Sequence, residues 1–178
     1  MKASVIILEG PDGSGKSTLA ATLRDAHGFS VVRSYGTTGY FPALKPQELF
    51  RSLTETIIAA CHSEMPVVID RSFMSEWCYG KVMRDHDRLG IEGFRWMSYL
   101  TKIYNVSEVI CLPPYDTVKA NWTEKRKAAW DPAKGTGDYV DAAHKLSLIY
   151  QNYEFLVESG HYIRFNYLKD SVKKVLGE

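Results

Sequence analysis

The sequence is short of several features, and each shortage excludes a class of protein. No segment approaches the roughly 18 consecutive apolar residues of a membrane span. Lys plus Arg number 22 and Asp plus Glu number 21, so the net charge of +1 gives no support to a polyanionic partner. The cysteines number three and are widely spaced, which is typical of core thiols in a reducing compartment and not of a disulfide framework. We therefore expect a cytoplasmic protein without a membrane segment.

What is present is enough for one good hydrophobic core. The chain has 178 residues, of which 45% are hydrophobic, and no stretch has the composition of a linker between two cores. Short apolar runs alternate with segments of helical periodicity. This order predicts an α/β fold of three layers, with a doubly wound, mainly parallel sheet and helices on both faces. We expect a single domain over 1–178.

The expected elements follow from periodicity and from the positions of Gly and Pro. Ser4 to Leu8 is apolar without alternation, the pattern of a strand buried on both faces. Gly28 is placed to end the first helix, and Pro46 to begin the second. Strands are expected at 4–8, 29–33, 67–69, 108–112 and 162–165, and helices at 17–27, 46–62, 75–86, 92–104, 116–129, 139–159 and 168–176.

A glycine-rich loop is the strongest signal in the sequence. Gly10 to Ser17 matches the pattern G-x-x-x-x-G-K-[ST], after an expected strand and before an expected helix. In such a loop, successive backbone N–H groups and the N-terminus of the helix face phosphate groups. We expect the phosphates of ATP to be bound by Gly10, Asp12, Gly13, Ser14, Gly15, Lys16, Ser17 and Thr18, with Lys16 on the β and γ phosphates and Ser17 on Mg²⁺.

Two carboxylates are candidates to serve the same site. Asp70 ends an expected strand and is followed by Arg71, at the edge of the sheet where ligands bind in this architecture. We expect Asp70 to bind Mg²⁺, usually through water; the less favoured alternative is that it caps the helix that follows. Asp12 lies inside the loop, where it can orient an acceptor hydroxyl or be a solvated turn residue.

These motifs together resemble the thymidylate kinase family, with relatives among the deoxynucleoside kinases. The resemblance is carried by Gly10 to Thr18, by Asp70-Arg71-Ser72-Phe73-Met74-Ser75 and by Tyr79-Gly80. It implies that Asp70 and Arg71 serve magnesium and the phosphates at the reaction centre, and that Asp12 contacts the acceptor sugar. It also implies an arginine on the preceding helix that holds the acceptor nucleotide, and Arg51 lies at nearly the right distance.

A basic segment corresponds to the mobile lid of such kinases. Lys125-Arg126-Lys127 lies in a lid-like segment at about 122–138, and the resemblance implies that its arginine closes over the transferring phosphoryl group. We choose Arg126 because a guanidinium fork suits phosphate oxygens better than an ammonium does. For Lys125 and Lys127, a solvated helix face is an equally good interpretation.

The acceptor side departs from the family. After the second strand, the family's Arg-Glu-Pro-Gly is replaced by a stretch that begins at Arg33 and has no glutamate, and the connection to Arg51 is short. We expect a remodelled acceptor pocket in which Arg33 and Arg51 bind the acceptor and Tyr35 and Phe73 offer a flat apolar wall to a base.

Three functions follow, in order of support. The first is transfer of the ATP γ-phosphate to a pyrimidine deoxynucleotide, with Lys16, Asp12, Asp70, Arg71 and Arg126 as catalytic residues and ATP and Mg²⁺ as cofactors. The second is the same transfer to 5-hydroxymethyluracil within phage DNA, for which a trimmed acceptor side is suited and which would place the chain in the host cytoplasm. The third is a nucleotide-controlled binding module. A homodimer through the aromatic face of 139–159 is a further possibility.

Overall fold

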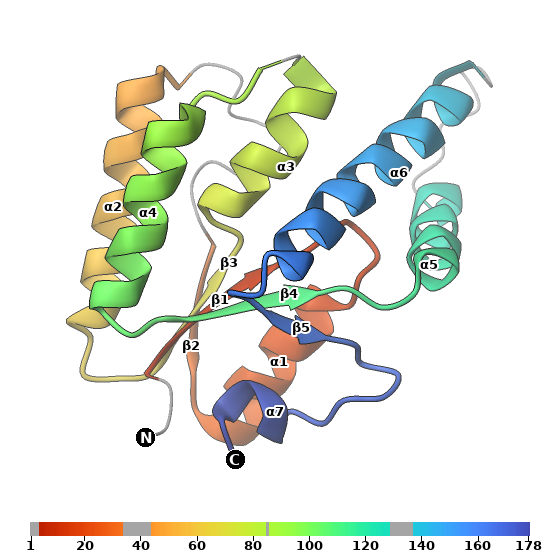
Figure 1. Cartoon of the computed structure of the whole chain (residues 1–178). Helices are drawn as coiled ribbons and strands as arrows, with labels where there is room; N and C mark the ends of the chain where they lie inside the picture. The colour runs from red at the N-terminus through yellow and green to blue at the C-terminus, as the bar shows by residue number, and fades with distance from the viewer. Residues whose placement is uncertain (1–3, 34–43, 85, 129–136) are drawn as a thin grey trace.

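The computed structural model describes residues 4–33, 44–84, 86–128 and 137–178, with the backbone alone at 126–128 and 137–141. Within these residues, the strands are β1 Val5–Glu9, β2 Ser30–Arg33, β3 Val67–Asp70, β4 Ser107–Cys111 and β5 Ile163–Phe165. They form one parallel sheet in the order β2-β3-β1-β4-β5 (Figure 1). The chain adds strands on both sides of β1, so the predicted doubly wound sheet is confirmed.

Helices connect the strands: α1 Lys16–His27, α2 Pro46–Cys61, α3 Phe73–Arg84, α4 Gly90–Ile103, α5 Tyr115–Ala128, α6 Gly137–Glu158 and α7 Lys173–Leu176. Helices α1 and α7 cover one face of the sheet, and α2, α3, α4 and α6 cover the other (Figure 1). The predicted three layers are therefore present. No helix of the described chain combines the length and the apolar content that crossing a membrane requires.

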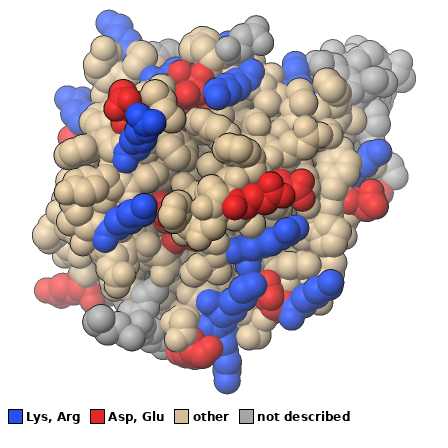
Figure 2. Space-filling view, in the orientation of Figure 1, with Lys and Arg blue, Asp and Glu red and all other residues tan. Residues whose placement is uncertain are grey.

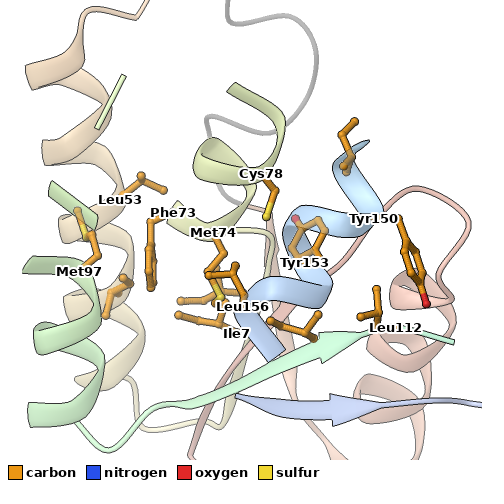
Figure 3. Packing of buried hydrophobic residues seen from close by; sticks show 14 of the residues in the cluster. Ile7, Leu53, Phe73, Met74, Cys78, Met97, Leu112, Tyr150, Tyr153 and Leu156 are labelled. Carbon is orange, nitrogen blue, oxygen red and sulfur yellow. The ribbon is translucent and has the colours of Figure 1, made fainter. Parts of the chain in front are cut away.

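Strand β1 shows why its sequence has no alternation. Ile6 and Leu8 pack with α1 and α7, whereas Val5 and Ile7 pack with the helices of the opposite face, and all four side chains are buried. Figure 3 shows Ile7 beneath side chains from α3 and α6. Because both faces are covered, every position of the strand is apolar until Glu9.

Helix α6 packs much of its apolar face, which we considered for a homodimer, against the core of its own chain. Its apolar side chains (Leu146, Ile149, Tyr150, Tyr153 and Leu156) are buried in the core of the chain (Figure 3). These side chains therefore serve the core. Exposed apolar side chains include Leu148 and Phe155 of α6 and, along α4, Ile91, Trp96, Tyr99 and Ile103.

The last helix is shorter than predicted. We expected 168–176, whereas α7 begins at Lys173. The Asp170 carboxylate accepts hydrogen bonds from the backbone N–H of Asn166 at 2.7 Å and from the Lys174 ammonium at 3.0 Å. Such local bonds from a side chain to the backbone compete with helix formation, so the segment after β5 is a turn.

Candidate functional site

The phosphate-binding loop joins the carboxyl end of β1 to α1, and its glycines are required by close approach of other backbone. Gly10 has φ +135° and Gly13 has φ +87°. A side-chain carbon at Gly10 would lie 2.3 Å from the carbonyl oxygen of Cys111, and one at Gly13 would lie 2.8 Å from the carbonyl oxygen of Val118. Both positions therefore accept only glycine. The motif reflects packing of the loop against β4 and α5.

A cavity of about 230 Å³ opens over this loop, and we call it the phosphate cavity. It is lined by residues 12–18 of the loop and by Arg33, Asp70, Arg71 and Lys125. The structure thus brings the predicted loop residues together with the Asp70-Arg71 pair from the end of β3. Arg33, which we predicted to bind the acceptor, lies in this cavity.

Lys16 is the buried cation of the phosphate cavity. Its ammonium donates hydrogen bonds to the carbonyl oxygens of Gly10 at 2.7 Å and Pro11 at 2.9 Å. Burial, together with the charge of Arg71, lowers the pKa of Lys16 from its ordinary value of 10.5 to about 8. The carboxylates of the described residues therefore do not offset the burial of this ammonium, and an anion in the cavity would supply the missing charge.

Ser17 and Asp70 offer hard oxygen atoms to the same cavity. The Asp70 side chain is 14% exposed, and it pairs with the guanidinium of Arg33 at 3.8 Å. Mg²⁺ prefers oxygen ligands and usually keeps several waters while it binds phosphates, so a hydroxyl and one weakly paired carboxylate fit it. Within the described residues, no group of three or more His, Cys, Asp and Glu side chains could hold a metal by itself.

Arg71 is held in an uncommon backbone conformation beside the loop. Its φ is +71°, and its backbone N–H donates to the carbonyl oxygen of Leu8 at 2.9 Å. Its guanidinium donates to the Asp12 carboxylate and to the hydroxyls of Ser75 at 3.2 Å and Tyr79 at 3.3 Å. Non-glycine residues at positive φ are concentrated at functional sites because the surroundings must hold them there.

A second cavity, of about 390 Å³, adjoins the first; we call it the α3 cavity. Its volume lies within the range of roughly 300–1,000 Å³ that is typical of small-molecule sites. Asp12 and Arg71 line both cavities, so these two side chains stand where the cavities meet. The lining comes from the loop, α2 and the α3 region: Asp12, Leu49, Leu53, Arg71, Ser72, Ser75, Glu76, Tyr79, Met83 and Arg84.

Glu76 and two arginines form an ion cluster at the wall of the α3 cavity. The buried Glu76 carboxylate accepts hydrogen bonds from the guanidinium of Arg84 and from that of Arg88, at 2.7 and 3.0 Å for Arg88. Burial opposes ionisation, but the bonds from Arg88 and the charge of Arg84 hold the pKa of Glu76 below its ordinary value. The cluster was not predicted from the sequence, because its members lie 8 and 12 residues apart along the chain.

Glu9 is the second functional candidate that was missed. It ends β1, is fully buried, and burial raises the pKa of its carboxyl group. The carboxylate accepts hydrogen bonds from the backbone N–H groups of Ser72 and Ser75, from the Ser75 hydroxyl at 2.6 Å and from the Tyr153 hydroxyl at 2.8 Å. It therefore anchors the start of α3 and Ser75, a partner of Arg71. A carboxylate directly after a fully apolar strand was the available signal.

Helix α5 packs against the phosphate loop through Asn121. Its side-chain amide donates to the carbonyl oxygen of Gly13 and to the Tyr167 hydroxyl, both at 2.9 Å. Lys125 lies one helical turn further along the same side and lines the phosphate cavity. Of the predicted lid residues, Lys125 thus lines the phosphate cavity, while the side chain of Arg126 lies outside the described residues.

Two predicted acceptor residues lie elsewhere. Phe73 is fully buried and packs edge-on against Phe94 with 5.1 Å between ring centroids, so it is a core residue and not a ligand wall. Arg51 is 75% exposed, pairs with Glu55 at 3.9 Å and lines neither cavity. The outward side of α2 carries Arg51, whereas Leu49 and Leu53 face the α3 cavity. Tyr35 lies outside the described residues.

Comparison with solved structures identifies the architecture. The chain is similar to the YorR protein from Bacillus subtilis, determined in complex with phosphorylated GDP, with a TM-score of 0.68 and 19% identity over 97% of this chain and 91% of that chain. It is also similar to deoxyadenosine kinase from M. mycoides with bound dATP, with a TM-score of 0.56 and 14% identity over 97% and 95% of the two chains.

A third similar structure is a gluconokinase from Sinorhizobium meliloti 1021, with a TM-score of 0.56 and 13% identity over 97% of this chain and 89% of that chain. The chain has the fold of the P-loop kinases. No protein-family profile matches it, and no curated protein matches it. The narrower resemblance to thymidylate kinases remains a prediction from the sequence.

Proposed function

We propose that the chain is an ATP-dependent kinase that phosphorylates a hydroxyl group of a deoxynucleoside. The observation that carries the proposal is the junction of the two cavities at Asp12 and Arg71. A triphosphate bound over the glycine loop and a small molecule in the α3 cavity would meet at this pair. The named kinases of similar fold support a phosphoryl transfer reaction.

On the donor side, backbone N–H groups and cations would bind the phosphates, and oxygen atoms would bind the metal. The loop N–H groups and the N-terminus of α1 would bind the β and γ phosphates, with Lys16 and Lys125 supplying charge. Ser17 and Asp70 would hold Mg²⁺, which when bound neutralises the charge of the phosphates. Catalysis of this kind rests on positioning and charge stabilisation.

On the acceptor side, Asp12 would bind the acceptor hydroxyl and Arg71 the transferring phosphoryl group. The Asp12 carboxylate would accept the hydrogen bond of the acceptor hydroxyl and orient its oxygen towards the γ-phosphate. Arg71 would donate to the oxygens of the transferring group, which bear the developing charge. Tyr79 supports both, since its hydroxyl oxygen accepts from the Asp12 backbone N–H at 3.0 Å and from Arg71.

Charge balance favours a neutral nucleoside over the monophosphate suggested by the sequence resemblance. The cations that line the described part of the α3 cavity are Arg71 and Arg84, and each is already paired with a carboxylate, Asp12 or Glu76. A monophosphate would bring close to two further negative charges, whereas a nucleoside brings none. The exposed Arg51 does not contribute a cation there.

DNA is the less favoured acceptor. A polyanion needs a continuous basic track, because phosphate contacts dominate nucleic-acid affinity. On the face shown in Figure 2, Lys and Arg side chains of the described residues are interspersed with Asp and Glu and form no such track. The near-neutral chain and a cavity of small-molecule size favour a free nucleoside.

The test follows the label from γ-labelled ATP into three acceptors: deoxynucleosides, deoxynucleoside monophosphates, and duplex DNA with and without 5-hydroxymethyluracil. We expect label in the deoxynucleosides. Label in monophosphates or in the modified DNA alone would overturn the acceptor assignment. Steady ATP hydrolysis without label in any acceptor would overturn the kinase proposal and support a nucleotide-controlled module.

A further inference from the structure

Two buried polar atoms at the wall of the α3 cavity make no hydrogen bond within the described structure. They are the hydroxyl oxygen of Ser72 and the Nε of Arg84. Both residues line the cavity, and Ser72 is only 2% exposed. An unpaired buried polar group costs roughly 1–3 kcal/mol, so folded proteins keep few of them. Two residues with such atoms at one cavity indicate a wall that is suited to a polar ligand.

Arg84 is held in place by its neighbours. One of its Nη atoms donates to Glu76, and Glu76 is fixed in turn by the buried Arg88, which also donates its backbone N–H to the same carboxylate. Arg84 itself remains one-third exposed at the cavity. A guanidinium oriented by a buried carboxylate is preorganised, because its rotamer is fixed before a ligand arrives.

The polar groups of this wall determine which kind of ligand atom can bind there. Guanidinium groups donate hydrogen bonds and never accept them. Glu76 already accepts bonds from both arginines, so it adds little acceptor capacity for a ligand. The ligand must therefore present an acceptor, and a carbonyl oxygen or a negatively charged oxygen satisfies this requirement. Since the cavity carries balanced charge, the neutral acceptor is favoured.

We propose that Arg84, oriented by Glu76, determines base specificity by donating to a carbonyl oxygen on the base of the acceptor nucleoside. This inference rests on the proposed kinase function and names the part of the substrate that it distinguishes. Thymine, cytosine and guanine carry an exocyclic carbonyl, and adenine does not. Deoxyadenosine should be the poorest acceptor, because its base has no carbonyl oxygen to accept the bond from Arg84.

The experiment measures kcat/KM with ATP for the four common deoxynucleosides in the wild type and in Arg84→Ala, Arg84→Gln and Arg95→Ala. Arg84→Ala should lower kcat/KM about 10- to 100-fold for the three carbonyl bases, as expected for a lost charged hydrogen bond, and leave deoxyadenosine within about twofold. Arg84→Gln keeps an N–H donor and should recover part of the loss. Arg95→Ala removes an exposed arginine of α4, which pairs with Glu92 and lines neither cavity, and should change nothing.

Folding is checked by thermal unfolding of each variant, and Glu76 keeps Arg88 as a partner in Arg84→Ala. Equal loss for all four nucleosides, no loss for any, or deoxyadenosine as the best acceptor would each overturn the inference while the kinase proposal stands. Loss confined to monophosphate acceptors would overturn it in favour of phosphate binding by Arg84. Absence of transfer to every acceptor would instead overturn the proposed function.

Discussion

The phosphate cavity and the α3 cavity share Asp12 and Arg71, but backbone shapes one and side chains shape the other. Backbone geometry forms the first, with glycines at positive φ and carbonyl oxygens of β4 and α5 pressed against them. The second is lined by side chains that bond to partners distant in sequence: Glu76 accepts from Arg88, and the Ser75 hydroxyl donates to Glu9. Backbone geometry requires particular residues at fixed spacing, whereas side-chain pairing can be achieved in many ways. The first is therefore visible as a motif and the second is not.

The largest expected effect concerns the buried cation of the phosphate cavity. Lys16→Met keeps the length of the side chain but removes its charge, and should lower the rate of phosphoryl transfer by about 1,000-fold or more, since one group that stabilises the transferring charge is lost. The measurement is the single-turnover rate with saturating ATP, and circular dichroism confirms the fold. Activity within tenfold of wild type would mean that the phosphates bind elsewhere.

The backbone character of the loop is tested by Gly10→Ala. The new methyl group would meet the Cys111 carbonyl oxygen at a positive φ, so the free energy of unfolding should fall by about 4 kcal/mol. Gly28→Ala is the matched control, because Gly28 also has positive φ but an alanine methyl there would have no described atom within 4 Å; it should cost about 1 kcal/mol. If Gly10→Ala and Gly28→Ala lower the free energy of urea unfolding equally, the contact with the Cys111 carbonyl oxygen is not the cause.

Stability should also depend on pH through Lys16. Its pKa is about 8 in the folded chain and 10.5 ordinarily, so between these pH values the unfolded chain binds a proton that the folded chain does not. The free energy of unfolding should therefore rise by about 3 kcal/mol between pH 8 and 10.5. Below pH 8, the buried ammonium lowers it by that amount. Comparing the pH slopes of wild type and Lys16→Met by urea unfolding isolates the contribution, and identical slopes would contradict it.

The side-chain bonds that support the lining of the α3 cavity are tested on two buried tyrosines of α6. The Tyr153 hydroxyl donates to the Glu9 carboxylate at 2.8 Å, and the Tyr150 hydroxyl donates to the neutral carbonyl of Pro113 at 2.9 Å. Because bonds to charged groups are stronger, Tyr153→Phe should cost about 2 kcal/mol and Tyr150→Phe about 1 kcal/mol. Only Tyr153→Phe should also reduce transfer, through Ser75 and Arg71. Equal costs would indicate that Glu9 is uncharged.

The smallest effect is expected at Arg51. Its exposed side chain lines neither cavity, so Arg51→Ala should leave kcat/KM for the acceptor within about twofold and stability within about 0.5 kcal/mol. A large rise in KM for the acceptor would restore the role implied by the family resemblance.

The sequence predicted the sheet, the order of the elements and the placement of Gly10–Ser17 beside Asp70-Arg71, because burial on both faces and close backbone approach restrict residue types strongly. The sequence did not show that Arg84 lines the α3 cavity and that Phe73 does not. Both lie on α3, and which side of a helix faces a cavity or the core depends on neighbours such as Phe94 that are distant in sequence. The position of Arg51 has the same cause: the helical periodicity of α2 places Leu49 and Leu53 on its buried side and Arg51 on its exposed side, away from both cavities.

The bridge between Asp12 and Arg71 has a thermodynamic consequence. Each of these groups satisfies the other, so a ligand that engages one of them in either cavity changes the partner available to a ligand in the other. The affinities for the two ligands are then linked, and linkage is reciprocal: whatever factor the triphosphate imposes on acceptor binding, the acceptor imposes on triphosphate binding. The coupling between the two proposed substrates therefore depends on this one ion pair, whichever of them binds first.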